Sequence, residues 1–211
     1  MSKIDFNSWI ENLSIRIDQG LPGESAHRLM MPSQRKSMPI DAEKKFRTAA
    51  VLALIVPDES NFLPRLILIE RSEGPVSHAG QISFPGGKRE GDEDLLATAL
   101  RETNEELGIP ADQVMLLGSL TSLYIPPSNF MVHPFLGYMN KIPDFVLSEA
   151  EVKRVLMPYV DVFLEEKNIS LELFKSTSGL TVHAPSYKYE DVTIWGATAM
   201  MIAEIGTLLK S

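Results

Sequence analysis

The spacing of apolar residues predicts a helix at each end of the chain. Residues 195–209 are expected to run from a strand into a closing helix. Residues 19–46 contain glycine and proline without a regular apolar period, which predicts an extended connector. Near the start, apolar side chains recur at the period of an amphipathic helix that packs on the main domain or on a partner subunit, and these are Phe6, Trp9, Ile10, Leu13 and Ile17.

Short apolar runs bounded by turn residues predict strands in the middle of the chain. Strands mixed with helices, in 211 residues of 44% apolar content, predict an α/β fold with one good-sized core. The expected strands cover residues 49–56, 65–70, 81–84, 114–120, 131–139 and 192–195.

The most informative stretch, residues 86–109, predicts a helix of about four turns. Asp92 is expected to cap its start, while Gly108 can take the left-handed conformation that ends a helix and Pro110 prevents continuation. One side suits packing against a sheet, because apolar or small residues recur there at the helical period: Leu96, Ala99, Leu100, Thr103 and Leu107.

Three glutamates, Glu102, Glu105 and Glu106, lie along one stripe of this helix. Like charges at this spacing repel, so stability alone does not favour the arrangement. Carboxylates without cysteine or nearby histidine favour a hard cation, Mg²⁺ or Mn²⁺, over zinc. Such an ion usually bridges protein to phosphate, which indicates metal-assisted hydrolysis. Taken alone, the cluster also fits a solvated acidic face.

Eight positions in and before this helix fall into a fixed pattern, namely Gly87, Glu93, Arg101, Glu102, Glu105, Glu106, Gly108 and Ile109. They resemble the signature of the Nudix hydrolases, in which the same residue types occur at the same spacing. Thr103 stands where the signature has an aliphatic residue. As a small branched residue, it can keep the packing role of that position.

The resemblance implies a fold and a division of the chain. The fold is an α/β/α Nudix sandwich with a mixed β-sheet, formed by residues 47–211. Residues 1–46 are then an N-terminal helix and connecting arm.

The same resemblance implies roles for the acidic residues. Glu102 and Glu106 are expected to bind Mg²⁺ or Mn²⁺, with the backbone carbonyl of Gly86 as a further ligand. Glu105 is the expected base or water-orienting group, although the division of labour among the three glutamates, all of them candidate ligands, stays open.

Glu93 and Arg101 are expected to form an ion pair. This pair either orients the helix for catalysis or is a surface salt bridge.

A second stretch, RSEGPVSHAGQISFPGG, is similar to the coenzyme A pyrophosphatase branch of this family. Segments 124–130 and 194–199 are similar to the same branch. Ile69 and Val76 depart from it, standing where the branch has a threonine and an arginine. If that arginine meets phosphate, Val76 removes a bidentate donor. The matching residues are Arg71, Ser72, Gly80, Phe84, Pro85, Gly86 and Gly87.

The branch implies a small-molecule diphosphate substrate, coenzyme A or an acyl derivative, cleaved to 3′,5′-ADP and a 4′-phosphopantetheine. Val76 favours the alternative of ADP-ribose or another nucleotide sugar. An alternative of another class is a non-catalytic sensor of nucleotide or coenzyme A, against which the intact glutamates argue. The residues expected to bind substrate are Arg71, His78, Phe84, Gly87 and Lys88.

An additional acidic group is expected near residues 148–152. Glu149 and Glu151 are candidates for the extra acidic residue that many Nudix enzymes bring from outside the motif. The alternative is that Ser148 caps a short helix whose dipole favours both glutamates.

Charge and composition limit the classes of partner that the protein can have. The net charge of −8 argues against binding to duplex nucleic acid, and the chain has no cysteine for a disulfide or a thiol nucleophile. The start lacks the apolar core of a signal peptide, and no stretch of about 18 apolar residues could span a bilayer. We therefore expect a cytoplasmic protein without a membrane partner, and dimerisation is a family-level expectation.

Overall fold

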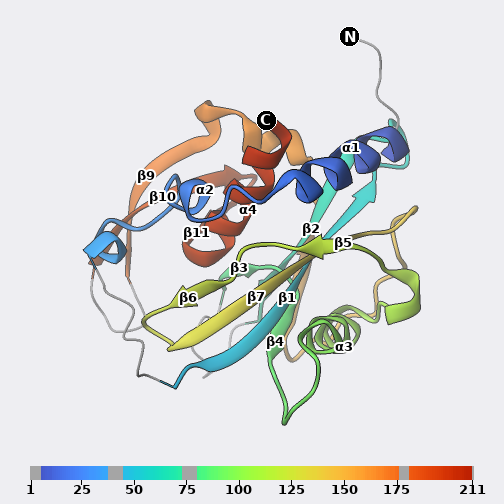
Figure 1. The fold of residues 1–211 in the computed structure, drawn as a ribbon, viewed down its shortest axis with the longest axis horizontal. Coiled ribbons are helices and arrows are strands. Elements are labelled where there is room, and N and C mark those ends of the chain that lie inside the picture. The colour runs from blue at the N-terminus through green and yellow to red at the C-terminus, as the bar shows by residue number, and fades with distance from the viewer. Residues whose placement is uncertain (1–5, 38–44, 73–79, 176–180, 211) are drawn as a thin grey trace.

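The computed structural model describes residues 6–37, 45–72, 80–175 and 181–210 (Figure 1). The helices are α1 (Phe6–Gln19), α2 (Glu24–His27), α3 (Leu95–Leu107) and α4 (Gly196–Lys210), with short 3₁₀ turns η1 (Ser33–Ser37), η2 (Ala111–Gln113), η3 (Val160–Leu164) and η4 (Glu166–Asn168). The strands are β1 (Arg47–Pro57), β2 (Pro64–Arg71), β3 (Ile82–Ser83), β4 (Gly86–Lys88), β5 (Met115–Ser119), β6 (Leu123–Ile125), β7 (Phe130–Tyr138), β8 (Val152–Leu156), β9 (Ile169–Lys175), β10 (Thr181–Tyr189) and β11 (Val192–Trp195).

The main sheet is mixed. Its strands follow the order β3-β2-β1-β7-β5, with β4 paired to β1, β6 to β7 and β8 to β2. The β1–β7 pair is parallel, whereas the other pairs are antiparallel. A smaller antiparallel sheet follows the order β11-β10-β9.

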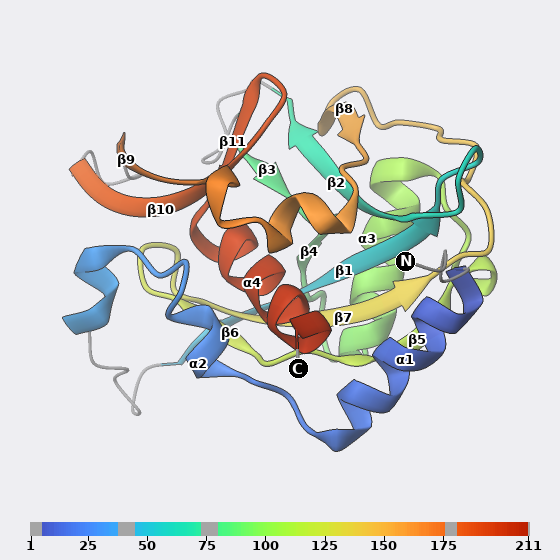
Figure 2. The same cartoon turned by 90° about the horizontal axis from the view of Figure 1, so that it is seen from above.

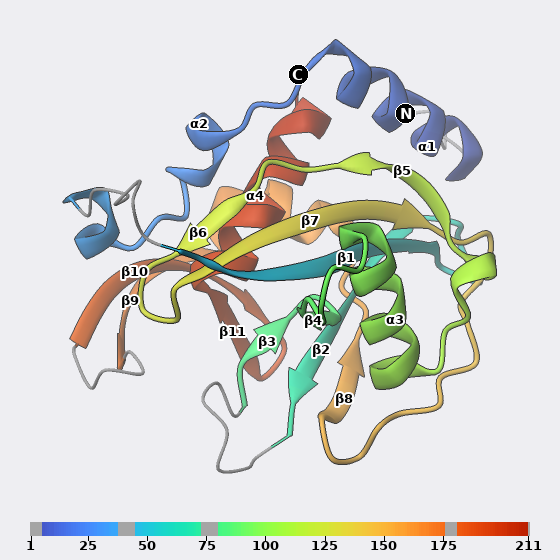
Figure 3. The same cartoon turned by 60° about the horizontal axis from the view of Figure 1, so that its bottom comes forward.

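Helices cover both faces of the main sheet, so the expected α/β/α sandwich with a mixed sheet is confirmed (Figures 2 and 3). Along β1, Leu52 and Leu54 pack toward α3, whereas Ala53 and Ile55 pack toward α4 and α1. This alternation follows from the two-residue period of a strand, and burial on both faces explains why the β1 sequence reads as a nearly continuous apolar run.

The N-terminal segment belongs to the same core as the sheet. Helix α1 forms as predicted, and its Phe6, Ile10 and Leu13 are buried among residues of the α4 face. The expectation of an extended connector is corrected, because the described part of residues 19–46 includes α2 and η1 and buries Met30. Contacts with distant parts of the chain determine this conformation, and the local spacing of apolar residues does not reveal such contacts.

All six predicted strands form, although the one expected over residues 81–84 shortens to β3. The predicted strand that runs into a closing helix is also present, as β11 and α4. The segment after Ser148 is not a helix, however, because a turn there leads directly into β8. Among the described residues, no helix combines the length and the apolar character needed to cross a bilayer.

Candidate active site

Helix α3 carries the acidic residues, and its ends are capped by local chemistry. Asp94, rather than the predicted Asp92, is the N-cap: its carboxylate accepts hydrogen bonds from Leu96 N at 2.8 Å and Ala97 N at 3.3 Å. The correction is two residues, because α3 starts at Leu95 and a cap must immediately precede the first turn. At the other end, Gly108 has φ 71° and ends the helix as expected.

Thr103 fills the position where the family signature has an aliphatic residue. It is buried, and its hydroxyl donates to the carbonyl of Ala99 at 2.7 Å. This bond satisfies the only polar group of the side chain within the helix. Thr103 therefore packs without leaving an unpaired hydroxyl in the core.

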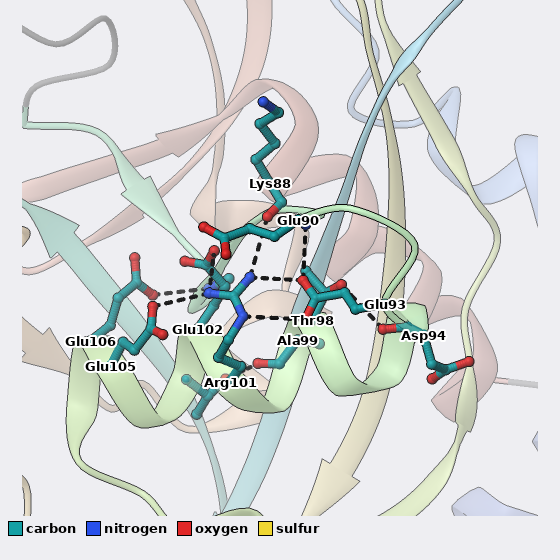
Figure 4. Close-up of polar contacts among 12 residues, drawn as sticks. Lys88, Glu90, Glu93, Asp94, Thr98, Ala99, Arg101, Glu102, Glu105 and Glu106 are labelled. Carbon is teal, nitrogen blue, oxygen red and sulfur yellow. Dashed lines mark hydrogen bonds and ion pairs between the residues drawn. The ribbon is translucent and has the colours of Figure 1, made fainter.

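Arg101 lies at the centre of the acidic cluster (Figure 4). Its Nη2 is 2.9 Å from Glu93 Oε1 and donates to the Lys88 carbonyl at 3.3 Å. Its Nη1 lies 3.0 Å from both Glu102 Oε1 and Glu105 Oε2. The predicted Glu93–Arg101 ion pair is thus present, and the guanidinium joins the loop before α3 to two glutamates of the helix.

Glu93 is also held from its own loop. Its carboxylate accepts a hydrogen bond from Glu90 N at 3.0 Å. The Arg101 guanidinium, followed by this backbone bond, lowers the pKa of Glu93 to about 2. Glu93 therefore stays charged and keeps Arg101 in place throughout the neutral range.

Glu106 is fully buried against the start of β4. Its Oε2 accepts the Gly86 N–H at 2.9 Å, and its Oε1 lies 3.3 Å from Arg71 Nη1. Burial raises the pKa of Glu106 to about 7, against the Gly86 bond and Arg71, while Glu102 and Glu151 raise it further. A carboxylate with so few neutralising partners is a favourable place for a cation.

Glu102 lies against the neighbouring glycine. A Cβ on Gly87 would be 2.4 Å from Glu102 Oε2, so the carboxylate occupies the space that a side chain would take. Burial raises the pKa of Glu102, despite the nearby Arg101. Glu102 and Glu106, one turn apart, therefore both contact the Gly86–Gly87 pair. Among the described residues, however, no three acidic or histidine side chains are grouped tightly enough to enclose a metal ion.

A turn from outside the helix brings Glu151 to the same place. Ser148 N donates to the Glu106 carbonyl at 3.0 Å, and Ser72 N donates to the Glu151 carbonyl at 2.9 Å. The turn is thus attached to both α3 and the end of β2. The charge of Glu151 raises the pKa of both Glu102 and Glu106. Sequence alone named both glutamates and could not choose between them.

The remaining predicted site residues lie in different surroundings. Phe84 is 1% exposed within the core on the α4 face, which gives it a packing role. Lys88 is exposed, and Figure 4 shows its side chain extending away from the carboxylates. Glu105 is the most accessible of the three helix glutamates, with 54% of its side chain exposed. His78 and Val76 lie outside the described residues.

Comparison with known proteins identifies the family. The model of the NUDIX domain matches residues 46–175. A protein of Yersinia enterocolitica named "Uncharacterized Nudix hydrolase NudL" is 34% identical over 155 residues, which cover 72% of this chain and 78% of that protein. The chain belongs to the Nudix hydrolase family. A Yersinia pestis protein of the same name is also 34% identical, over 161 residues covering 75% of this chain and 78% of the relative.

A solved Nudix structure agrees with the fold. The crystal structure of a MutT/nudix family protein from Enterococcus faecalis superposes with a TM-score of 0.52 and covers 95% of this chain and 74% of that chain. The sequence identity is 15%, so this likeness concerns the fold alone. Within the Nudix chain, the oxygen-rich surroundings of Glu102 and Glu106 fit a hard divalent cation.

Proposed function

We propose that this Nudix hydrolase cleaves the diphosphate linkage of coenzyme A or an acyl derivative, giving 3′,5′-ADP and a 4′-phosphopantetheine. The observation that supports it most directly is the contact of Glu102 and Glu106 with the same glycine pair, Gly86–Gly87. Two carboxylates beside bare backbone are oxygen donors of the kind that hold a hard divalent cation, which can in turn bind phosphate oxygens.

Glu102 and Glu106 are the residues that would hold Mg²⁺ or Mn²⁺, with Glu151 as the acidic group from outside the motif. When bound, the cation would lower the pKa of water and stabilise negative charge on phosphate oxygens. Burial suits Glu106 to this role, because a carboxylate in the interior that is only partly compensated by its neighbours gains most from a further positive charge.

Glu105 is the proposed proton acceptor. Its side chain is more than half exposed and lies beside the Arg101 guanidinium, so it can reach solvent while staying near the cluster. Arg71, which contacts Glu106 at the edge of the cluster and is partly exposed, is the proposed donor to a substrate phosphate.

The substrate proposal rests on the similarity of residues 71–87 and 124–130 to the coenzyme A branch. Val76 is the observation that favours a second candidate, ADP-ribose or another nucleotide sugar, because the arginine of the branch is absent from that position. Both candidates share the diphosphate linkage and the same acidic residues.

A panel of diphosphates separates the candidates. Purified protein is incubated with coenzyme A, acetyl-coenzyme A, ADP-ribose and a nucleotide sugar, each with Mg²⁺ or Mn²⁺, and the products are identified by mass spectrometry. We expect 3′,5′-ADP and 4′-phosphopantetheine from coenzyme A. Turnover confined to ADP-ribose or the nucleotide sugar would refute the substrate while leaving the reaction class intact.

The Glu106→Gln variant tests whether the protein is an enzyme or a sensor. We expect at least a ~100-fold loss of metal-dependent turnover, because the buried carboxylate contributes several kcal/mol of electrostatic stabilisation. Asp112→Asn removes an exposed carboxylate after α3 and serves as the charge-matched control. A wild type that binds coenzyme A but cleaves no diphosphate would support the sensor instead.

A further inference from the structure

The pairing of β2 with β8 contains an extra residue next to the active site. Glu70 faces Arg154, but the following residue, Arg71, faces Val152, so Lys153 is a β-bulge in β8. In a regular antiparallel ladder Arg71 would face Lys153. A bulge bends its strand and changes the direction of the side chains beside it.

The bulge directs two cations onto one buried carboxylate. Lys153 Nζ lies 2.7 Å from Glu70 Oε1, and Arg154 Nε lies 2.5 Å from Glu70 Oε2. Only 8% of the Glu70 side chain is exposed. Burial alone would raise the pKa of Glu70, but the hydrogen bonds from Lys153 and Arg154 lower it. Each oxygen of Glu70 therefore holds one of the two residues of the bulge.

Arg154 also connects this strand pair to the smaller sheet. Its Nη2 donates to both carboxylate oxygens of Asp191, at 2.9 and 2.8 Å. Asp191 lies in the turn between β10 and β11. The bulge is thus fixed from two sides, by the buried Glu70 and by a turn of the second sheet.

The turn that precedes the bulge is attached to α3 at Glu106. Glu151 stands two residues before Lys153, and its carbonyl accepts the Ser72 N–H at 2.9 Å. Glu151 N and Val152 N both donate to the Ser148 carbonyl, while Ser148 N donates to Glu106 O. Without the bulge, Glu151 would be displaced by one residue along β2, and a shift of one residue turns a side chain to the opposite face.

We propose that Glu70 is a positioning residue, which holds the Lys153 bulge and thereby presents Glu151 to the carboxylates of α3. The inference rests on the proposed function, in which those carboxylates hold a divalent cation. Both carboxylate oxygens of Glu70 are paired, with Lys153 and Arg154, so Glu70 is not itself proposed as a metal ligand. Its effect on the site passes through the register of β8.

The test measures Mn²⁺ affinity by electron paramagnetic resonance in the wild type, Glu70→Gln, Glu151→Gln and the double variant. We expect about a 10-fold weaker affinity in Glu70→Gln, the size typical of groups that orient metal ligands. Added to Glu151→Gln, the same change should alter the affinity by less than about twofold, because its route to the site is already lost.

Two further variants separate positioning from stability. Asp58→Asn removes another buried carboxylate paired to an arginine, Arg65 at 2.7 Å, at the opposite end of β2. This control should lose stability but keep Mn²⁺ affinity. If Glu70→Gln fails to fold, Lys153→Met, at a half-exposed position, removes one of the two clamping cations and should weaken Mn²⁺ binding in the same direction.

The outcomes distinguish this inference from the proposed function. The positioning role is overturned if Glu70→Gln keeps a Mn²⁺ affinity within twofold of wild type. Where Glu70→Gln does not fold, the same criterion applies to Lys153→Met. The role is also overturned if the effects of Glu70→Gln and Glu151→Gln on affinity multiply in the double variant. If the wild type binds Mn²⁺ and the variants show the coupling, but the wild type cleaves no diphosphate, hydrolysis is refuted and the positioning role is supported.

Discussion

Gly87 shows how a single missing side chain shapes the site. A Cβ there would lie 2.4 Å from the Glu102 carboxylate, and its φ is not in the left-handed region, so alanine meets a steric conflict rather than backbone strain. We expect Gly87→Ala to displace Glu102 and to reduce Mn²⁺ affinity and turnover by about 10- to 100-fold. Metal titration and a hydrolysis assay measure this, and circular dichroism checks that the fold is retained.

Gly206→Ala is the matched control, because a Cβ at this helical position would have its nearest neighbour at an ordinary 3.4 Å. It should keep full turnover. Normal metal affinity in Gly87→Ala would show that the Glu102 carboxylate has no fixed place beside the glycine.

The acidic residues of α3 could be predicted from the sequence, because carboxylates at this spacing share one side of a helix and are ligands that a hard cation prefers. The partner of Glu93 could be predicted in the same way, since Arg101 belongs to the same pattern. The link from Arg71 to Glu106 could not, because it joins residues on different elements. The proposal of Glu151 rather than Glu149 likewise depends on tertiary structure, because the turn is attached to α3 through Ser148 N and Glu106 O.

Among the elements, Glu204 joins helix α4 to two other segments, one at α2 and one at Thr121. The carboxylate is fully buried, lies 3.0 Å from His27 Nε2, and accepts hydrogen bonds from Gly23 N at 3.2 Å and Thr121 N at 3.1 Å. Burial would raise the pKa of Glu204, but the hydrogen bonds from His27 and Thr121 lower it below its usual 4.5. We expect Glu204→Gln to reduce the free energy of unfolding at pH 7 by about 3 kcal/mol.

The pH dependence of this loss has a definite sign. A carboxyl with a lowered pKa in the folded state stabilises the fold above the unfolded pKa, and this contribution disappears as pH falls through the folded pKa. The difference between wild type and Glu204→Gln should therefore be constant from pH 7 to about 5 and shrink below 4.5. Urea unfolding at several pH values measures it, and a difference that grows with acidity would contradict the assigned direction.

Elements with a strong local pattern were predictable, and those defined by distant partners were not. β1 and β2 contain continuous apolar runs, which is why the sequence predicts both strands. Ser148 and the two glutamates after it would suit the start of a short helix, but pairing with β2 makes the residues that follow the strand β8. β9 is not among the strands predicted from the sequence: apolar and polar residues alternate along it, but its Leu171 and Leu173 face solvent.

At the scale of the whole molecule, the question is whether residues 1–46 form a separate arm. The proposed division places the Nudix domain at residues 47–211. Helix α1, however, packs against α4 from the layer opposite α3, and Arg16 Nη1 donates to the Leu208 carbonyl at 2.9 Å (Figure 2). The N-terminal segment should therefore unfold together with the sheet rather than before it.

Leu13→Ala tests this cooperativity. Leu13 is 0% exposed, so its truncation leaves a cavity and should cost about 2–5 kcal/mol in the unfolding of the entire chain. Ile15→Ala on the same helix is the control, since Ile15 is 54% exposed and should change stability by less than about 0.5 kcal/mol. Urea unfolding is followed by the fluorescence of Trp195 in a Trp9→Phe background. Trp195 lies in β11, so its fluorescence reports on the smaller sheet. A Trp195 transition that Leu13→Ala leaves unchanged would mean that α1 folds as an independent arm.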